Sequence, residues 1–597
     1  MSTTASLPTT EKILSVQDIS SSLQRFGWAD YFVFVFMLVV CAGIGVYFGF
    51  VEKRKKNEKK ERDVEDRRGS EALDYLVGGR KMKVIPVSLS LVASFVSGIS
   101  LLGTSTEIYV YGTQYAFILI TIVIAGFISW YIFLPVFVNL QLTSTYEYFE
   151  LRFGRSLRLV GSIIFFFDMI TWLPITAYVP ALTFNQVTGI NIHIITPIVC
   201  AICIFYTCVG GLKAVVWTDT FQSFIMFGSM ILIMVKGTLD AGGLETVWQR
   251  NYDGGRLVLP DLTLDPTVRL SILAVLIGGT VHKTQSTAIN QIIVQRFMSL
   301  PTKEDCKKCL YIFIFLLILL TGSCVYVGLI LYATYYDCDP VASGLAQHRD
   351  QMVPLLVADL LQALPGMSGL FVSAVFSASL SSMSTGLNSM SAVILEDFIK
   401  PFRSKPLSER QVHYLLRLTV VLFGIAIISL VFIVEKLGMV LQLATTLGAV
   451  THGPMMMIFF LGICVPWVNS KSMLTGAITG FLLMTWICMK AQFAIYTKEM
   501  TFPTKNISVE GCTYDFEYKN VTPIYTEPTE KGLHHMSFMY YTLAGFLVTG
   551  LATILGSFLF GLNDTSIVDK KLIATFVHKF MKPSKYDIVE MQDNSKK

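Results

Sequence analysis

The chain has 597 residues, of which 53% are hydrophobic and only 15% are charged, and its formal net charge is +5. A soluble protein of this length carries far more charge, and no polar stretch is long enough to form a large soluble domain. Apolar runs of about 20 residues recur along nearly the whole sequence, which is typical of a polytopic membrane protein. The composition therefore predicts an all-α protein that crosses the lipid bilayer about thirteen times.

The apolar runs follow one another in chain order. The predicted spans are residues 29–51, 85–108, 115–139, 157–184, 192–210, 214–237, 269–298, 309–335, 367–397, 413–435, 438–466, 472–495 and 537–561. The first span is followed by the basic run EKRKKNEKKERDVEDRR (52–68). Because short basic loops stay in the cytoplasm, this run places the N-terminus outside the cell. An odd number of spans then leaves the C-terminus in the cytoplasm of a multi-pass cell-membrane protein.

These spans divide the chain into segments on alternating sides of the membrane. The predicted order is an extracellular N-terminus (1–28), a first helix (29–51), a basic cytoplasmic loop (52–84), a first repeat (85–237), an extracellular loop (238–268), a second repeat (269–466), a helix (472–495), an extracellular loop (496–536), a last helix (537–561) and a cytoplasmic tail (562–597). Asn506 and Asn520 begin glycosylation sequons in the second of these extracellular loops. Cys338 and Cys512 also fall in loops predicted outside, where a disulfide can form.

Two predicted spans contain residues that interrupt helices. The second span includes SLVASFVSGISLLGTS (90–105), which is rich in Gly and Ser, and the seventh includes LIGGTVHKTQSTAINQ (276–291). Unwound backbone at membrane depth is tolerated only where it faces protein or a water-filled cavity. Because five spans separate the two, the spacing predicts inverted repeats of spans 2–6 and 7–11, each opening with a broken helix.

The ninth span carries the hydroxyl-rich stretch FSASLSSMSTGLNSM (376–390). Such hydroxyls can bond back to a carbonyl one turn earlier, allow close helix packing, line a polar path or bind a cation. The adjacent pair Ser381 and Ser382, with the carbonyl of Ala378, offers three neutral oxygens to a hard monovalent cation. Two carbonyls from the interrupted stretch ASFVSG (93–98) would complete a shell of about five oxygens.

Several motifs in matching order resemble the sodium/solute symporter family. They are the second-span motif, LTSTYEYFELRFG (142–154), VGGLKAVVWTDTFQ (209–222), NQIIVQRFMS (290–299) and the ninth-span motif. The resemblance is nearest to the branch of sodium-coupled monocarboxylate, multivitamin and iodide transporters. It implies the leucine-transporter-like 5+5 inverted-repeat fold and sodium-driven uptake of a solute by alternating access.

The resemblance also implies ligands for sodium. The family's main sodium site maps onto the carbonyls of Ala93, Val96 and Ala378 and the hydroxyls of Ser381 and Ser382. Another candidate, Asp219, matches a position where some relatives place an acid near a further sodium site. An acid inside a membrane span is costly and usually functional. Because Asp219 lies near the start of the sixth span, a surface-facing acid or a helix cap is the alternative.

The seventh span departs from the pattern GGTF-x-W-x-S-x-YGVNQ of that branch. Lys283 stands at the position of the Trp, Thr287 stands at that of the Tyr, and His282 is added. A lysine at bilayer depth costs roughly 2.5–3.5 kcal/mol, so Lys283 should face the cavity, a carboxylate or a bound anion. A purely structural partner is the alternative.

Three further residues complete the candidate solute cavity. His452 stands where relatives usually have Gly, and either packing or a proton-sensing role is open to it. Ser97 and Ser100 lie in the interrupted second span, and Ser100 replaces the Gln of the iodide transporter, which disfavours iodide. A small organic anion, such as a monocarboxylate or a vitamin, is the predicted solute.

The sequence therefore predicts a sodium-coupled symporter, with sodium as a co-transported ligand and no cofactor. It has no GxxxxGK[ST] motif for nucleotide-driven pumping, and we expect neither catalysis nor nucleic-acid binding. A sodium-gated sensor or channel, a sodium-coupled sugar or polyol transporter, and a scaffold protein remain alternatives.

Overall fold

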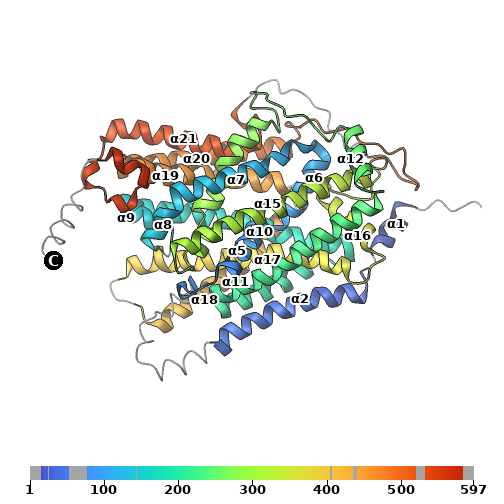
Figure 1. The fold of residues 1–597 in the computed structure, drawn as a ribbon, viewed down its shortest axis with the longest axis horizontal. Helices are drawn as coiled ribbons and strands as arrows, with labels where there is room; N and C mark the ends of the chain where they lie inside the picture. Colours follow the sequence, from blue (N-terminus) through green and yellow to red (C-terminus); the bar gives the residue numbers. More distant parts are fainter. Residues whose placement is uncertain are drawn as a thin grey trace, which may run out of the picture.

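The structure is a computed structural model that describes residues 15–24, 26–52, 77–142, 144–403, 407–434, 440–519 and 532–581. Its long helices lie side by side and run along the long axis of the molecule (Figure 1). The helices are α1 (Val16–Leu23), α2 (Trp28–Val46), α5 (Val84–Phe95), α6 (Gly98–Tyr111), α7 (Ile118–Ile128), α8 (Leu134–Leu140), α9 (Glu147–Phe153), α10 (Arg155–Thr188), α11 (Ile192–Asp240), α12 (Leu244–Asp253), α13 (Gly279–Thr284), α14 (Gln291–Phe297), α15 (Lys303–Thr334), α16 (Met352–Leu361), α17 (Met367–Val393), α18 (Glu409–Val434), α19 (Val440–Cys464), α20 (Ser470–Tyr496) and α21 (Phe538–Phe560).

The helices account for most of the predicted spans. In the described residues, 10 helices are long and apolar enough to cross a membrane, and the bent pair α5 and α6 raises the number to 11. Helix α11 has 49 residues and is interrupted at Gly211, which has a φ of 59°. The parts of α11 before and after Gly211 have 19 and 29 residues, or about 28 and 43 Å at 1.5 Å per residue, and a bilayer core is about 30 Å thick. Each part is therefore about long enough for one of the two spans predicted there, while the number thirteen stays a prediction.

The second and the seventh predicted spans are both interrupted, the second at Val96 and Ser97 and the seventh at Asn290. Between α5 and α6 the chain bends by 58°. Val96 and Ser97 there have extended backbone, with ψ values of 104° and 169°. The seventh span consists of the π-helical turn η6 (Ala274–Gly278), α13, a second π-helical turn η7 (Gln285–Ile289) and α14. Its interruption falls at Asn290, where ψ is 126°.

The glycine pair of the seventh span serves packing instead of unwinding. Gly278 and Gly279 are both helical, and a Cβ atom on Gly278 would lie 2.2 Å from the carbonyl oxygen of Met539 in α21. Only a glycine allows the two backbones to approach so closely. The interruption at Asn290 is the N-terminal end of α14. The Asn290 side chain caps this helix, because it accepts a hydrogen bond from Ile292 N at 2.9 Å.

Helix α17 forms the centre of the bundle. It packs against α2, α5, α10, α11 and α18. The helical segment 367–402 contains an apolar stretch of 18 residues, and 94% of that stretch is buried inside the protein. The hydroxyl-rich stretch is therefore surrounded by other helices and does not face lipid, which explains how a membrane helix tolerates so many oxygens.

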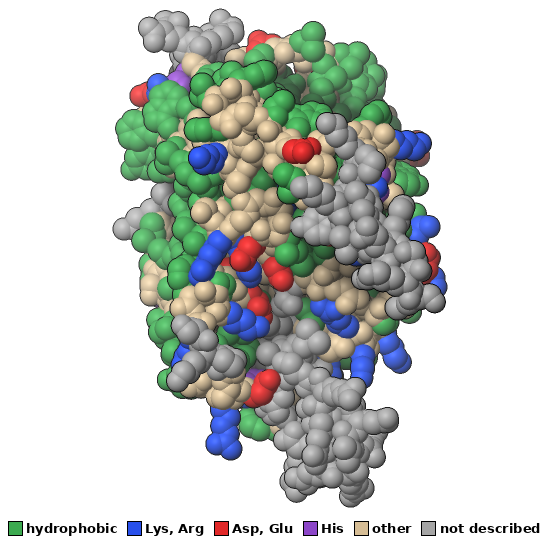
Figure 2. Space-filling view, turned by 90° about the vertical axis from the view of Figure 1, so that its left-hand side faces the viewer, with side chains coloured by type: hydrophobic (Ala, Val, Ile, Leu, Met, Phe, Trp, Pro, Cys, Tyr) green, Lys and Arg blue, Asp and Glu red, His purple; other side chains and the backbone are tan. Residues whose placement is uncertain are grey.

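The two ends of the bundle collect different loops. Helix α9 and the segment 565–580 lie at one end, and α12 and α1 lie at the other (Figure 1). At the first end, Tyr148 of α9 donates a hydrogen bond to Leu572 O at 3.0 Å, and Lys and Arg side chains are spread over the surface (Figure 2). The predicted alternation of loops across a membrane stays a prediction, and so does which end faces the cytoplasm.

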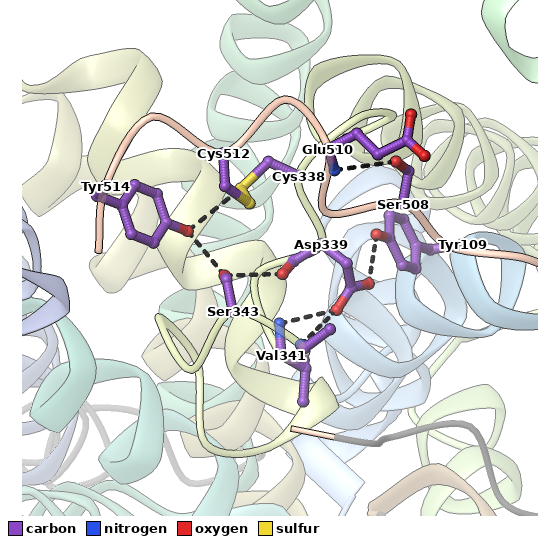
Figure 3. Close-up of a disulfide and its surroundings, with 10 residues drawn as sticks. Tyr109, Cys338, Asp339, Val341, Ser343, Ser508, Glu510, Cys512 and Tyr514 are labelled. Atoms are coloured by element: carbon purple, nitrogen blue, oxygen red, sulfur yellow. Dashed lines mark hydrogen bonds between the residues drawn. A yellow bond between two sulfur atoms is a disulfide. The ribbon is translucent and has the colours of Figure 1, made fainter. Parts of the chain in front are cut away.

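A disulfide joins two loops at the α12 end. It connects Cys338 with Cys512, which are 174 residues apart (Figure 3). A backbone hydrogen bond joins the same two loops next to the disulfide, because the Asp339 N–H donates to Ser508 O at 2.9 Å. In the same segment Asn506 is exposed, as glycosylation requires, whereas Asn520 lies outside the described residues.

The disulfide loop also contacts the broken second span. The carboxylate of Asp339 accepts a hydrogen bond from the hydroxyl of Tyr109 in α6 at 2.7 Å. On the other side, the hydroxyls of Ser343 and Tyr514 are 2.7 Å apart, and burial raises the pKa of Tyr514. The loop is thus tied to the α12 end of α6.

We expect Cys512→Ser to loosen the segment 501–519. Loss of a disulfide removes a constraint on the unfolded segment and typically costs about 2–4 kcal/mol. External protease applied to intact cells should then cleave this segment faster than in the wild type. Cys208→Ser, which replaces a free cysteine, is the control. Equal cleavage of all three proteins would show that the disulfide does not hold the loop.

Candidate sodium and solute sites

The end of α5 lies directly against the middle of α17. The hydroxyl oxygens of Ser94 and Ser381 are 2.9 Å apart. The Ser382 hydroxyl donates to the carbonyl of Ser94 at 3.3 Å and to that of Ala378 at 3.0 Å. The two segments proposed to share a cation are therefore in contact.

The interruption after α5 leaves carbonyl groups available. Because Val96 is extended, it ends the helix, and the Ala93 carbonyl has no donor one turn later in α5. The hydroxyls of Ser381 and Ser382 keep acceptor lone pairs even while they donate. Neutral oxygens of this kind suit a hard monovalent cation, so the residues present fit sodium.

The other hydroxyls of α17 have different partners. Ser373 donates to the carbonyl of Gly369 at 2.7 Å, which is a bond to the preceding turn. Ser379 donates to Thr176 O of α10 at 2.5 Å, and Ser389 donates to the Gln295 side chain of α14 at 2.8 Å. Back-bonding and contacts between helices therefore explain several of these hydroxyls without any cation.

Asp219 is fully buried in α11, so the alternatives of a surface-facing acid and a helix cap are wrong. Its Oδ2 accepts from Arg296 Nη2 at 2.6 Å, from the Ser90 hydroxyl at 2.6 Å and from the Ser94 hydroxyl at 3.3 Å. Its Oδ1 has no hydrogen-bond partner in the described part of the chain. Asp219 thus belongs to a network that reaches Ser381 through Ser94.

Sequence reasoning missed Arg296, the partner of this acid. Arg296 is fully buried in α14 and also donates to the Thr385 hydroxyl of α17 at 2.5 Å. The signal was present, because an arginine inside the predicted seventh span requires a partner or a cavity. The ion pair connects the second half of the broken seventh span with α11 and α17.

A cavity of about 140 Å³ lies beside the interruption of the second span. Ser100, His282, Lys283 and His452, four of the predicted cavity residues, line it. Ser97 does not line the cavity and is buried at the interruption.

Thr287 does not line the cavity either, because the π-helical turn η7 directs it toward another helix. Its hydroxyl is 2.9 Å from that of Ser129, and it donates to Lys283 O at 2.8 Å.

Lys283 faces the cavity without an ion-pair partner among the described residues. Its Nζ lies 4.9 Å from the centroid of the Phe95 ring, a cation–π contact. Phe95 is the last residue of α5, next to the candidate sodium ligands. The cavity therefore presents an ammonium group that a solute anion can reach, close to the proposed cation site.

His452 makes polar contacts on both sides of its ring. Its Nε2 is 3.3 Å from Asp168 Oδ1, and its Nδ1 is 3.4 Å from His282 Nδ1. The Thr451 hydroxyl donates to the same Asp168 oxygen at 2.7 Å. Sequence reasoning missed Asp168, although an acid within the predicted fourth span signals a functional site.

A membrane helical bundle with a broken span beside a buried hydroxyl-rich helix, and a polar cavity next to both, defines the class of secondary transporters. The family model described as "Sodium:solute symporter family" matches residues 75–480. The chain belongs to this family, and the predicted family is confirmed.

Similar proteins agree with this assignment. Sodium-coupled monocarboxylate transporter 1 of Homo sapiens is 37% identical, and the match covers 88% of this chain and 86% of that protein. Sodium-coupled monocarboxylate transporter 2 of Mus musculus is 34% identical, over 94% of this chain and 88% of that protein.

A solved structure of a Na⁺-coupled sialic acid symporter, in a substrate-bound outward-open state, superposes with a TM-score of 0.71. It has 22% sequence identity and covers 90% of this chain and 99% of that chain, so it shows the fold alone. The predicted all-α transporter fold is confirmed.

Proposed function

We propose that this protein is a sodium-coupled symporter that imports a small organic anion, with monocarboxylates as the first candidates. The observation that carries the choice of an anion is Lys283, a cation in the cavity that lies over the Phe95 ring and forms no ion pair in the described part of the chain. Asp168, the acid on the same cavity wall, is bonded to His452 and Thr451. A buried ammonium without a direct ion-pair partner is costly, and a solute carboxylate would supply that partner. The relatives that are named for monocarboxylates support the same choice.

Sodium is proposed to bind between α5 and α17, at Ala93, Val96, Ala378, Ser381 and Ser382. Asp219 is a candidate for a further sodium ion. Because Phe95 and Val96 also line the cavity, ordering this interruption shapes the wall that the solute meets. Coupling requires that sodium and solute both bind the same conformation more tightly than the other. Each charge moved inward gains on the order of 2 kcal/mol per 100 mV of membrane potential.

Alternating access also requires that the bundle close at its α12 end, and a buried ion pair is placed to do this. Arg269 donates to both carboxylate oxygens of Glu107 in α6, at 2.9 and 3.0 Å. It also donates to Gln442 in α19 at 2.9 Å, and its guanidinium lies 4.1 Å from the Tyr111 ring centroid. The ion pair and the Gln442 bond thus connect three elements: α6 of the broken second span, the start of the seventh span at Arg269, and α19.

We expect Glu107→Gln to shift the population toward a conformation open at the α12 end. Breaking a buried ion pair costs about 3–5 kcal/mol, because Arg269 is left uncompensated in the closed state. A cysteine introduced at Ser100, on the cavity wall, should react with an impermeant thiol reagent at least about tenfold faster. Asp240→Asn, which removes the more exposed ion pair with Lys236, is the control. Unchanged reactivity at matched surface expression would show that the pair is no gate.

The proposed function is tested by uptake in sodium medium and in choline medium. The panel contains lactate, short-chain acids, pantothenate, biotin, sugars and myo-inositol. We expect concentrative, sodium-dependent uptake of one or more of the carboxylates. Uptake of the neutral solutes alone would favour a sugar or polyol transporter, and a sodium current without accumulation would favour a sensor.

A further inference from the structure

We propose that His452, held between Asp168 and His282, binds a proton in the solute cavity, and that this proton binds together with the solute anion. The inference rests on the proposed function, since it assigns a second positive charge to the anion site. It gives the cavity a ligand that sodium coupling does not require.

The contacts of His452 fit the protonated ring. A histidinium donates from both ring nitrogens, and here one nitrogen faces a carboxylate and the other faces a ring nitrogen that can accept. Nε2 faces Asp168 Oδ1 at 3.3 Å, and Nδ1 faces His282 Nδ1 at 3.4 Å. His282 accepts there as the neutral tautomer that carries its hydrogen on Nε2. The added proton comes from water and forms the second N–H bond of His452.

The charges of the cavity explain why proton and anion bind together. Lys283 and Asp168 line the cavity with opposite charges, so with both histidines neutral these side chains sum to zero. A carboxylate solute adds a negative charge that nothing on this wall balances. A proton on His452 restores neutrality, which matters because unbalanced charge in a low-dielectric site is costly. By linkage, each ligand then raises the affinity for the other.

Few other charges face the histidine pair from the surrounding helices. Lys283 of α13 opposes protonation, Asp168 of α10 favours it, and α21 contributes the uncharged Thr542, 3.3 Å from His282 Nδ1. Glu107 of α6 is bonded to Arg269. The remaining charges on packed helices are Arg158, which is paired with Asp397 and Glu150, and the exposed Arg155, Lys471 and Lys490. Proton binding therefore depends on Asp168, Lys283 and the solute.

The first test measures sodium-dependent uptake of pyruvate, which is fully ionised throughout the range used. Histidines titrate there, so the half-saturating concentration in the wild type should rise about tenfold between about pH 5.5 and pH 7.5. The sign follows because the proton-bound form holds the anion and is lost as the pH rises.

Two variants and a control sharpen the test. His452→Gln should flatten the pH dependence to less than about twofold, because no proton can be bound. Asp168→Asn should also flatten the pH dependence. It should keep a low half-saturating concentration of pyruvate at high pH, because no negative charge among the described cavity residues then opposes Lys283. His193→Gln, at an exposed histidine in α11, should behave as the wild type.

The second test uses purified full-length protein in detergent and weak buffer, with an indicator dye. Adding pyruvate in the presence of sodium should cause the wild type to take up protons and His452→Gln to take up none. Sodium-driven uptake with the same pH dependence in wild type and His452→Gln, or pyruvate binding without proton uptake, overturns the proton site and leaves the symporter proposal intact. If the wild type shows no sodium-driven uptake, the symporter proposal fails, and proton uptake on adding pyruvate still decides the proton site.

Discussion

Lys283→Gln is expected to raise the half-saturating concentration of a transported carboxylate by about ten- to a hundredfold. A hydrogen bond to a charged group contributes about 1.5–3 kcal/mol, and the variant keeps the polar group while removing the charge. Uptake of lactate and of its neutral amide, measured side by side, reports the effect. We expect lactate to lose its advantage over the amide, because only the anion uses the ammonium group.

Two further variants separate charge from shape. Lys283→Arg keeps the positive charge and should retain preference for the anion. Lys307→Gln removes a lysine that also lies over an aromatic ring, with Nζ 5.6 Å from the Trp130 centroid, but outside the cavity. It should transport as the wild type does. If Lys283→Gln keeps an unchanged substrate profile, Lys283 is structural and another group holds the solute.

Ser382→Ala is expected to raise the sodium concentration for half-maximal uptake by about tenfold or more. It removes one of five proposed oxygen ligands, and the loss of one charge-assisted contact is worth about 1.5–3 kcal/mol. Uptake of the best carboxylate across a sodium titration measures the shift, with surface expression determined in parallel.

Ser373→Ala is the matched control on the same helix. Ser373 also donates to a carbonyl one turn earlier, at 2.7 Å, and is not among the proposed ligands. It should leave sodium dependence unchanged, because only a bond within α17 is lost. A normal sodium dependence in Ser382→Ala, or an equal shift in both variants, would remove Ser382 from the site.

Composition and local pattern were enough to predict the elements that position the site. The Gly- and Ser-rich stretch after Ala93 predicted an interruption, and the chain bends there by 58°. For the hydroxyl-rich stretch, close helix packing was one of four alternatives, and α17 is buried among the other helices of the bundle. These features are local, because they depend on which residues can leave a helix or tolerate a polar interior.

The cavity wall could be predicted only in part, since it depends on contacts between distant segments. Thr287 was expected on the wall by its position in the span, but the π-helical turn η7 changes the helical phase. Asp168 contacts His452, and Arg296 pairs with Asp219, so each contact joins two different helices. Their presence inside spans is visible in the sequence, whereas the choice of partner follows from the tertiary packing.

The central claim is that sodium, bound between α5 and α17, drives a solute anion into the cell. Proteoliposomes with a single orientation of the protein and an imposed inward sodium gradient test this claim most directly. Labelled pyruvate should accumulate inside above its external concentration, and the accumulation should vanish when choline replaces sodium. With Ser382→Ala, the initial rate of accumulation at the same sodium concentration should be lower. Equal accumulation in choline, or sodium entry with no accumulation of any carboxylate in the panel, would contradict it.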